Sequence, residues 1–116
     1  AEPVSDRKPP RWLVGVVAML HDRFSENLSL DEIADEAGVH RVHLARTFRA
    51  HHGCTLGDYV RRLRIEAACR GLADSNLPLV EVALSAGFSD QSHFSKAFRN
   101  AMGMTPGEFR RQHRTR

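Results

Sequence analysis

Two stretches of the sequence, GVHRVHLARTFR (Gly38–Arg49) and GFSDQSHFSKAFR (Gly87–Arg99), give nearly the same phrase twice within 116 residues. Each has a glycine, one apolar residue, a short polar run and an apolar residue four positions before a phenylalanine. These apolar pairs are Leu44 with Phe48, and Phe94 with Phe98. Apolar residues four apart lie on one face of a helix. Both stretches therefore predict a glycine-containing turn followed by an amphipathic helix.

The match extends upstream of both glycines. Ile33-Ala34 precede Gly38 as Val82-Ala83 precede Gly87, an offset of 49 residues, whereas Phe48 and Phe98 are 50 apart. The second copy therefore has one extra residue after its glycine. A short helix, a tight turn and a second helix of about three turns is the pattern of a helix-turn-helix unit.

The rest of the chain predicts further helices and no strand. A helix begins near Arg11, buries a face and ends near residues 24–27; the residues of that face are Trp12, Val16, Met19 and Leu20. Short helices follow over 30–37, between Pro78 and Gly87, and after Thr105, where Pro106 takes the first position. SLDE (Ser29–Glu32) predicts a capping box, in which Ser29 accepts from the Glu32 N–H and the Glu32 carboxylate reaches back. The two longer helices of the repeat are predicted at 40–52 and at 89–102, the second capped by Ser89.

A long helix over 56–73 has two apolar flanks instead of one. The first flank holds Leu56, Tyr59, Val60, Leu63 and Ala67; the second holds Ile65, Ala68, Cys69 and Leu72. Such a helix suits a position between two small lobes. We therefore expect an all-α fold with two helix-turn-helix lobes joined by a linker helix. The expected divisions are 1–10 as a flexible, proline-containing arm, 11–54 as the first lobe, 55–75 as the linker helix and 76–116 as the second lobe.

The exposed stripes of the two repeat helices point to nucleic acid. With Leu44 and Phe48 inward, Val42, Arg46 and Arg49 face out; with Phe94 and Phe98 inward, Ser92, Lys96 and Arg99 face out. A B-DNA major groove of about 12 Å admits one such helix, whereas A-form RNA hides its major groove. The net charge of +3 and pI near 9.4 also favour a polyanion. Duplex DNA is therefore the preferred partner.

At these residues the sequence resembles the DNA-binding domain of AraC/XylS-type transcriptional regulators. The resemblance covers roughly residues 12–111, and VALSAGFSDQSHFSKAFRNAMGMTPGEFR is its most specific part. It implies that two lobes enter successive major-groove segments, and it places eight residues toward bases: Val42, His43, Ala45, Arg46, Gln91, Ser92, Ser95 and Lys96. His40 stands where the family usually has a serine-like cap, so the first turn of that helix is expected to be less well fixed.

Phosphate contacts are expected from Arg49, His51, His52 and Arg99, and from the amides at the starts of the short helices 30–37 and 79–86. Arg110, Arg111 and Arg114 are expected to add diffuse attraction. The resemblance also implies an activator more often than a repressor, and a protein that works with RNA polymerase. Any part of the protein before residue 1 would sense an effector or dimerise; the alternative is a short, stand-alone regulator of the same family that is controlled by its abundance.

Other classes of function are less well supported. No zinc spacing, nucleophile elbow, phosphate loop or carboxylate pair is present, so we expect no metal, no cofactor and no enzymatic activity. Two cysteines, Cys54 and Cys69, and the lack of a bilayer-length apolar run favour a cytoplasmic location without a membrane. The main alternative is a helical protein-interaction module whose exposed stripes bind an acidic protein partner.

Overall fold

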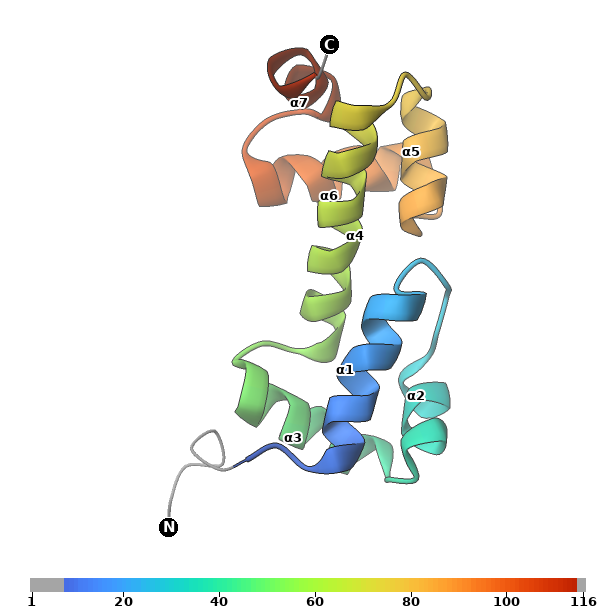
Figure 1. The fold of residues 1–116 in the computed structure, drawn as a ribbon, viewed down its shortest axis with the longest axis vertical. Helices are drawn as coiled ribbons and strands as arrows, with labels where there is room; N and C mark the ends of the chain where they lie inside the picture. The colour runs from blue at the N-terminus through green and yellow to red at the C-terminus, as the bar shows by residue number, and fades with distance from the viewer. Residues whose placement is uncertain (1–7, 115–116) are drawn as a thin grey trace. The chain divides into compact units, whose positions relative to one another are not determined.

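The computed structural model describes residues 8–114, and all its regular elements within that range are helices (Figure 1). They are α1 (Arg11–Arg23), α2 (Leu30–Ala37), α3 (Arg41–His52), α4 (Leu56–Asp74), α5 (Leu79–Ala86), α6 (Gln91–Met102) and α7 (Pro106–His113). The all-α expectation is confirmed. Of the predicted arm, residues 1–7 lie outside the described range.

The described residues divide between two compact units that meet within α4, at Arg61 and Arg62. In the first unit α1, α2 and α3 pack against one another in pairs. Their facing side chains are buried: Leu13, Val16 and Leu20 from α1, Ile33 and Ala34 from α2, Leu44 and Phe48 from α3. Trp12 and Met19, predicted for the same face of α1, are only half-buried.

Aromatic rings close the first core beneath α3. The Phe48 ring is fully buried and meets the edge of Tyr59, from the start of α4, at a centroid distance of 5.4 Å. The Tyr59 hydroxyl forms a 2.7 Å hydrogen bond with His21 Nε2 on α1. The start of α4 is thereby tied to both α1 and α3.

The second unit has its own core, built from the end of α4 and from α5, α6 and α7. Its buried residues are Ile65, Ala68, Leu72, Val82, Ala83, Ala86, Phe88, Phe94, Phe98 and Phe109. Cys69 packs against this cluster as a half-buried side chain, and burial raises the pKa of its thiol. Burying a phenylalanine side chain contributes about 1.5–3 kcal/mol, so the four buried rings of this unit supply a large part of its stability.

The starts of α2 and α6 differ from the sequence-based expectation, whereas α7 begins at Pro106 with Thr105 as its cap, as expected. Ser29 Oγ accepts from the Glu32 N–H at 3.1 Å, but the Glu32 carboxylate accepts from the Ser29 hydroxyl and not from its backbone. The reciprocal capping box occurs instead at α7, between Thr105 and Glu108. Asp90, not Ser89, caps α6, because its Oδ1 lies 2.7 Å from the His93 N–H three positions on. Ser89 is one residue too early to cap a helix that begins at Gln91.

His40 does cap α3, contrary to the expectation of a poorly fixed first turn. It has extended backbone angles, and its Nδ1 accepts from the Val42 N–H at 3.1 Å. An imidazole nitrogen thus takes the role that an oxygen plays at most helix starts.

Candidate nucleic-acid interface

The first helix-turn-helix unit is built by α2, a glycine turn and α3. Gly38 has φ of 73°, a conformation that a residue without Cβ adopts freely, and its N–H bonds to carbonyls in the last turn of α2. The Val39 N–H reaches the Ala34 carbonyl at 3.1 Å, and His40 then opens α3. These bonds fix the direction in which α3 leaves α2.

The outward face of α3 carries the predicted base-facing residues of this unit. Val42, His43, Ala45 and Arg46 are all exposed, and Val42 is 46% exposed although it is apolar. No acidic residue occurs in α3. The side chains of Arg46 and Arg49 make no ion pair or hydrogen bond with residues 8–114. Both guanidinium groups are therefore available to an anion.

The second helix-turn-helix unit repeats this construction with α5 and α6. Gly87 has φ of 103°, its N–H bonds to the Leu84 carbonyl at 3.0 Å, and the Phe88 N–H bonds to the Ala83 carbonyl at 3.0 Å. The extra residue of this copy lies between Phe88 and the cap Asp90. From the caps onward the two copies are in register at an offset of 50, from His40 and Asp90 to Phe48 and Phe98.

The outward face of α6 is polar and also free of acidic residues. Gln91, Ser92 and Lys96 are exposed, and Ser95 is half-buried. Within the described part of the chain Lys96 has no ion-pair partner. The face therefore offers amide, hydroxyl and ammonium groups, which can donate hydrogen bonds to base edges or phosphates.

The repeat continues beyond Gly38–Arg49 and Gly87–Arg99, and this extension was not predicted from the sequence. GCTLGDY (Gly53–Tyr59) matches GMTPGEF (Gly103–Phe109) at the same offset of 50. Both glycines are left-handed caps, with φ of 71° and 74°, and the threonine hydroxyls accept from the Asp58 and Glu108 N–H groups. The aromatic residues match in space as well: the Phe48–Tyr59 rings meet at 5.4 Å and 83°, the Phe98–Phe109 rings at 5.5 Å and 78°. Aligning the copies past Arg49 and Arg99 would have found this.

Two of the three predicted histidine contacts, His43 and His52, lie against aromatic rings, and the third, His51, is half-buried. His43 is exposed, with its ring centroid 5.4 Å from that of Trp12 on α1. His52 stacks on Phe48 at 4.4 Å and also meets Tyr59 at 5.5 Å. Burial, with a smaller contribution from the charge of His51, lowers the pKa of His52, so its imidazole is neutral at pH 7.

The other predicted phosphate ligands differ in how free they are. Arg99 is exposed, and its charge helps to lower the pKa of Glu108 after the larger effect of hydrogen bonds from Thr105. Arg110 is half-buried and donates from Nε to the Leu72 carbonyl at 3.1 Å, so it closes the end of α4 and is not a diffuse surface charge. Arg111 and Arg114 are exposed.

The starts of α2 and α5 are not equivalent as anion sites. The first turn of α2 holds Asp31 and Glu32, whose carboxylates repel phosphate, and Ser29 already caps it. The first turn of α5 has one acid, Glu81, and its cap Pro78 makes no side-chain hydrogen bond to it. Free amides are therefore more accessible to phosphate at α5.

Residues 8–114 contain neither a cluster of metal-ligating side chains nor a membrane-spanning helix. Histidine, cysteine and acidic side chains do not gather in groups of three or more that could hold a metal ion. No helix in this range has the length and apolar character of a membrane span.

Comparisons with known proteins agree with this geometry. A family model described as a helix-turn-helix domain matches residues 33–112. The activator AarP of Providencia stuartii is 36% identical over 95 residues, which are 82% of this chain and 70% of AarP. The chain spans only 31–52% of six other curated relatives.

Two solved structures share the fold. An AraC-type regulator from Chromobacterium violaceum is 34% identical with a TM-score of 0.81, covering 88% of this chain and 91% of that one. The DNA-binding domain of AdpA, a global transcriptional factor solved with a target DNA, is 26% identical with a TM-score of 0.82, covering 91% and 93%. Fold and outward faces define a helix-turn-helix DNA-binding protein. The chain belongs to the AraC-type helix-turn-helix family of transcription regulators. The protein-interaction alternative is not favoured.

Proposed function

We propose that the chain reads two consecutive major-groove segments of one duplex, α3 entering the first and α6 the second. In this proposal residues 11–54 and 76–116 act as the two reading lobes, 55–75 as the helix that links them and 1–10 as an arm. The observation that supports it is the pair of acid-free outward faces at an offset of 50, where neither Arg46 nor Lys96 has an ion-pair partner among residues 8–114. Adjacent segments are about 10 base pairs apart, so the expected site covers about two helical turns.

The proposed contacts of α3 are made by Val42, His43, Ala45 and Arg46. Val42 and Ala45 can make apolar contact with a thymine methyl group, and Arg46 can donate two hydrogen bonds to the O6 and N7 acceptors of guanine. His43, held against Trp12, is placed beside these residues by a ring contact and not by a hydrogen bond. Arg46 is therefore the main hydrogen-bonding residue of this helix.

The proposed contacts of α6 are made by Gln91, Ser92, Ser95 and Lys96, with Gln91 suited to adenine. Arg49 and Arg99 would bind phosphates at the rear of the two helices. His52 would add at most a neutral N–H donor, since its pKa is lowered by burial, and His51 would contact a phosphate beside it. Backbone amides at the start of α5 would complete the phosphate contacts.

Selection of bound duplexes from a random library tests this proposal. A single enriched motif of about two turns is expected, and enrichment of a motif of one turn or of none would contradict it. Arg46→Ala should then lose about 1–3 kcal/mol on the selected site and relax the preference at one or two positions. Arg61→Ala is the matched control, because Arg61 pairs with Asp58 at 3.1 Å and lies outside both outward faces. Equal losses on selected and random duplexes would reduce Arg46 to a phosphate contact.

We further propose that the chain activates transcription in the cytoplasm by working with RNA polymerase. Support comes from AarP, which is named a transcriptional activator. An effector-sensing or dimerisation domain before residue 1 is proposed because most of the curated relatives above are about three times as long as the region that they share with this chain, which is 31–36% of their length. We assign the chain no catalytic activity and no cofactor. A reporter promoter carrying the selected site, with and without the Arg46→Ala substitution, tests the sign of regulation.

A further inference from the structure

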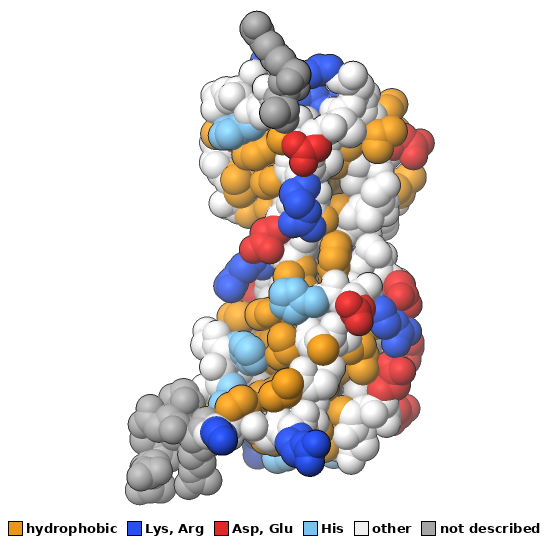
Figure 2. Space-filling model, viewed as in Figure 1, with side chains coloured by type: hydrophobic (Ala, Val, Ile, Leu, Met, Phe, Trp, Pro, Cys, Tyr) orange, Lys and Arg blue, Asp and Glu red, His pale blue; other side chains and the backbone are white. Residues whose placement is uncertain are grey.

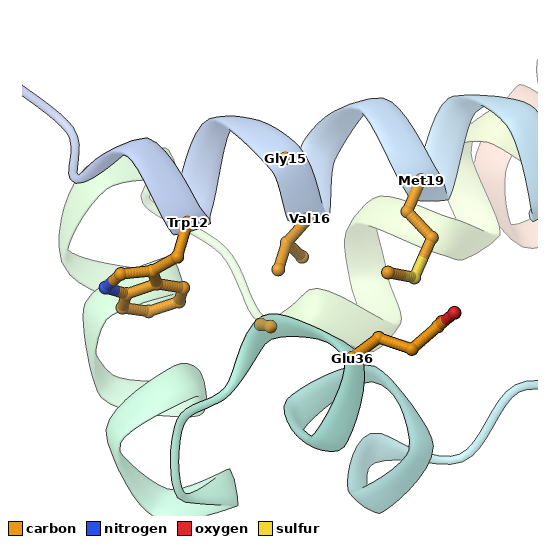
Figure 3. A pocket seen from close by; sticks show the side chains of 6 residues that line it. Trp12, Gly15, Val16, Met19 and Glu36 are labelled. Carbon is orange, nitrogen blue, oxygen red and sulfur yellow. The ribbon is translucent and has the colours of Figure 1, made fainter.

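A groove of about 240 Å³ lies between α1 and α2 in the first unit (Figure 3). Trp12, Val16 and Met19 extend from α1 toward α2, with Trp12 at one end and Met19 opposite Glu36 at the other. Gly15 and Ala37 complete the lining. None of these residues belongs to the proposed DNA-reading faces. The volume is below the range of about 300–1,000 Å³ for small-molecule pockets but can admit one apolar side chain.

Gly15 keeps this groove open, although the fold does not require a glycine at this position. It lies in the middle of α1, where glycine is less favourable than alanine by roughly 0.5–1 kcal/mol. Its φ is not positive, and a Cβ built on it would meet no atom within 4 Å. Neither backbone conformation nor internal packing therefore requires glycine here. What its missing side chain does is leave space between Trp12 and Met19.

The surface beside the groove has the opposite charge from the rest of the protein. Six of the 14 acidic residues lie within residues 22–36, a segment whose only Lys or Arg is Arg23. Arg23 is already engaged, with Glu26 at 3.1 Å and with Glu36 at 3.0 Å. Figure 2 shows acidic side chains gathered along the edge of the first unit that α2 forms. This surface repels DNA and complements a cation.

We propose that the groove docks a cationic, amphipathic segment of a protein partner. One apolar side chain of the partner enters between Trp12 and Met19, over Gly15. Lysine or arginine residues on either side of that anchor pair with carboxylates of α2, including Asp35 and Glu36. An apolar anchor supplies the affinity, and the surrounding charges supply orientation and association rate.

The test uses a capped seven-residue peptide with a central leucine between lysines and arginines. Trp12 is the only tryptophan, so its emission reports occupancy of the groove directly. The leucine peptide should produce a saturable change in emission. A serine-centred peptide and a peptide with glutamate flanks should each bind about tenfold more weakly or worse.

Variants of the protein separate this site from general charge attraction. Gly15→Gln fills the groove with a good helix former, and it should weaken the leucine peptide by about tenfold or more. Gly57→Ala is the matched control, since it adds a methyl to a helical glycine in the same unit, away from the groove. The Asp35→Asn, Glu36→Gln double variant should lower affinity and flatten its salt dependence. Circular dichroism should show all variants folded.

Three results would overturn the inference. The first is that the leucine peptide does not bind the unsubstituted chain, and the second is that it binds the Gly15→Gln variant equally well. The third is that the unsubstituted chain sediments as a dimer and the Gly15→Gln variant does not. The last would make a second copy the occupant. The DNA affinity of Gly15→Gln should equal that of the unsubstituted chain, so failure here leaves the proposed DNA contacts untouched.

Discussion

Replacing Phe98 by alanine should unfold the second unit while leaving the first one folded. Phe98 is fully buried, and its ring meets those of Phe94 at 5.6 Å and Phe109 at 5.5 Å. Phe→Ala substitutions in cores cost about 3–5 kcal/mol. A core in a unit of fewer than about 70 residues rarely supplies more than 3–5 kcal/mol. The loss is therefore as large as the whole stability of a unit that spans Arg62–Arg116.

Two optical signals separate the units. Helices α5, α6 and α7 contain 8, 12 and 8 residues, so Phe98→Ala should remove about a third of the helical ellipticity, and more if the end of α4 frays. Trp12 lies in the first unit and should keep its native emission. Phe48→Ala is the reciprocal variant, because Phe48 is the residue equivalent to Phe98 in the first core, and it should shift that emission.

The refuting result is simple to recognise. If Phe98→Ala shifts the Trp12 emission with the same midpoint as the loss of ellipticity, the two cores unfold as one cooperative unit. The inference from the repeat that the two lobes fold independently would then be wrong, although the assignment of the helices would be unaffected.

Three further predictions follow from particular side chains. Because burial lowers the pKa of His52 in the folded protein, the unfolded chain binds a proton at this residue more readily, and the first unit should lose stability as the pH falls below about 6.5. His52→Phe keeps the ring stacking on Phe48 and should make the melting temperature of the first unit less dependent on pH. Arg110→Ala should cost about 1–3 kcal/mol because it removes the hydrogen bond to the Leu72 carbonyl near the end of α4, whereas Arg111→Ala should change stability by less than about 0.5 kcal/mol. Asp90→Ala should lower the free energy of unfolding by about 0.5–2 kcal/mol, whereas His40→Ser should leave it unchanged because serine can also cap a helix. Equal losses of stability for the two variants, measured by chemical denaturation, would contradict the capping assignments.

Most of the fold could be predicted because its signals are local. Apolar residues at helical spacing placed Phe48 and Phe98 in cores, and both are fully buried. Glycines predicted the turns after α2 and α5, where a left-handed residue is required. These features depend on a few neighbouring residues, so one sequence is sufficient to find them.

What was missed depends on contacts between distant segments or on one bond among several possible bonds. Nothing near Arg110 in the sequence indicates that its guanidinium reaches the carbonyl of Leu72, 38 residues earlier. Ser89 and Asp90 are both good cap residues, and only the exact start of α6 decides between them. The stacking of the exposed His52 ring on Phe48, four residues earlier, was also not predicted, and a phosphate contact by His52 stays a prediction. The identity of the base-contacting residues stays a prediction for the same reason, because it depends on DNA.

The repeat separates the residues that build a lobe from those that distinguish one lobe from the other. The glycine caps after α3 and α6, the buried phenylalanines and the threonine caps recur at an offset of 50. The outward pairs differ: Val42 with Ser92, Ala45 with Ser95, Arg46 with Lys96. Because the outward faces differ, we expect the two lobes to prefer different base sequences. The proposed site must therefore have two unlike halves, and a single chain can bind it in only one direction. A directional complex presents the acidic edge of α2 to one side of the site only, which is the condition under which a partner bound there could act on a neighbouring promoter.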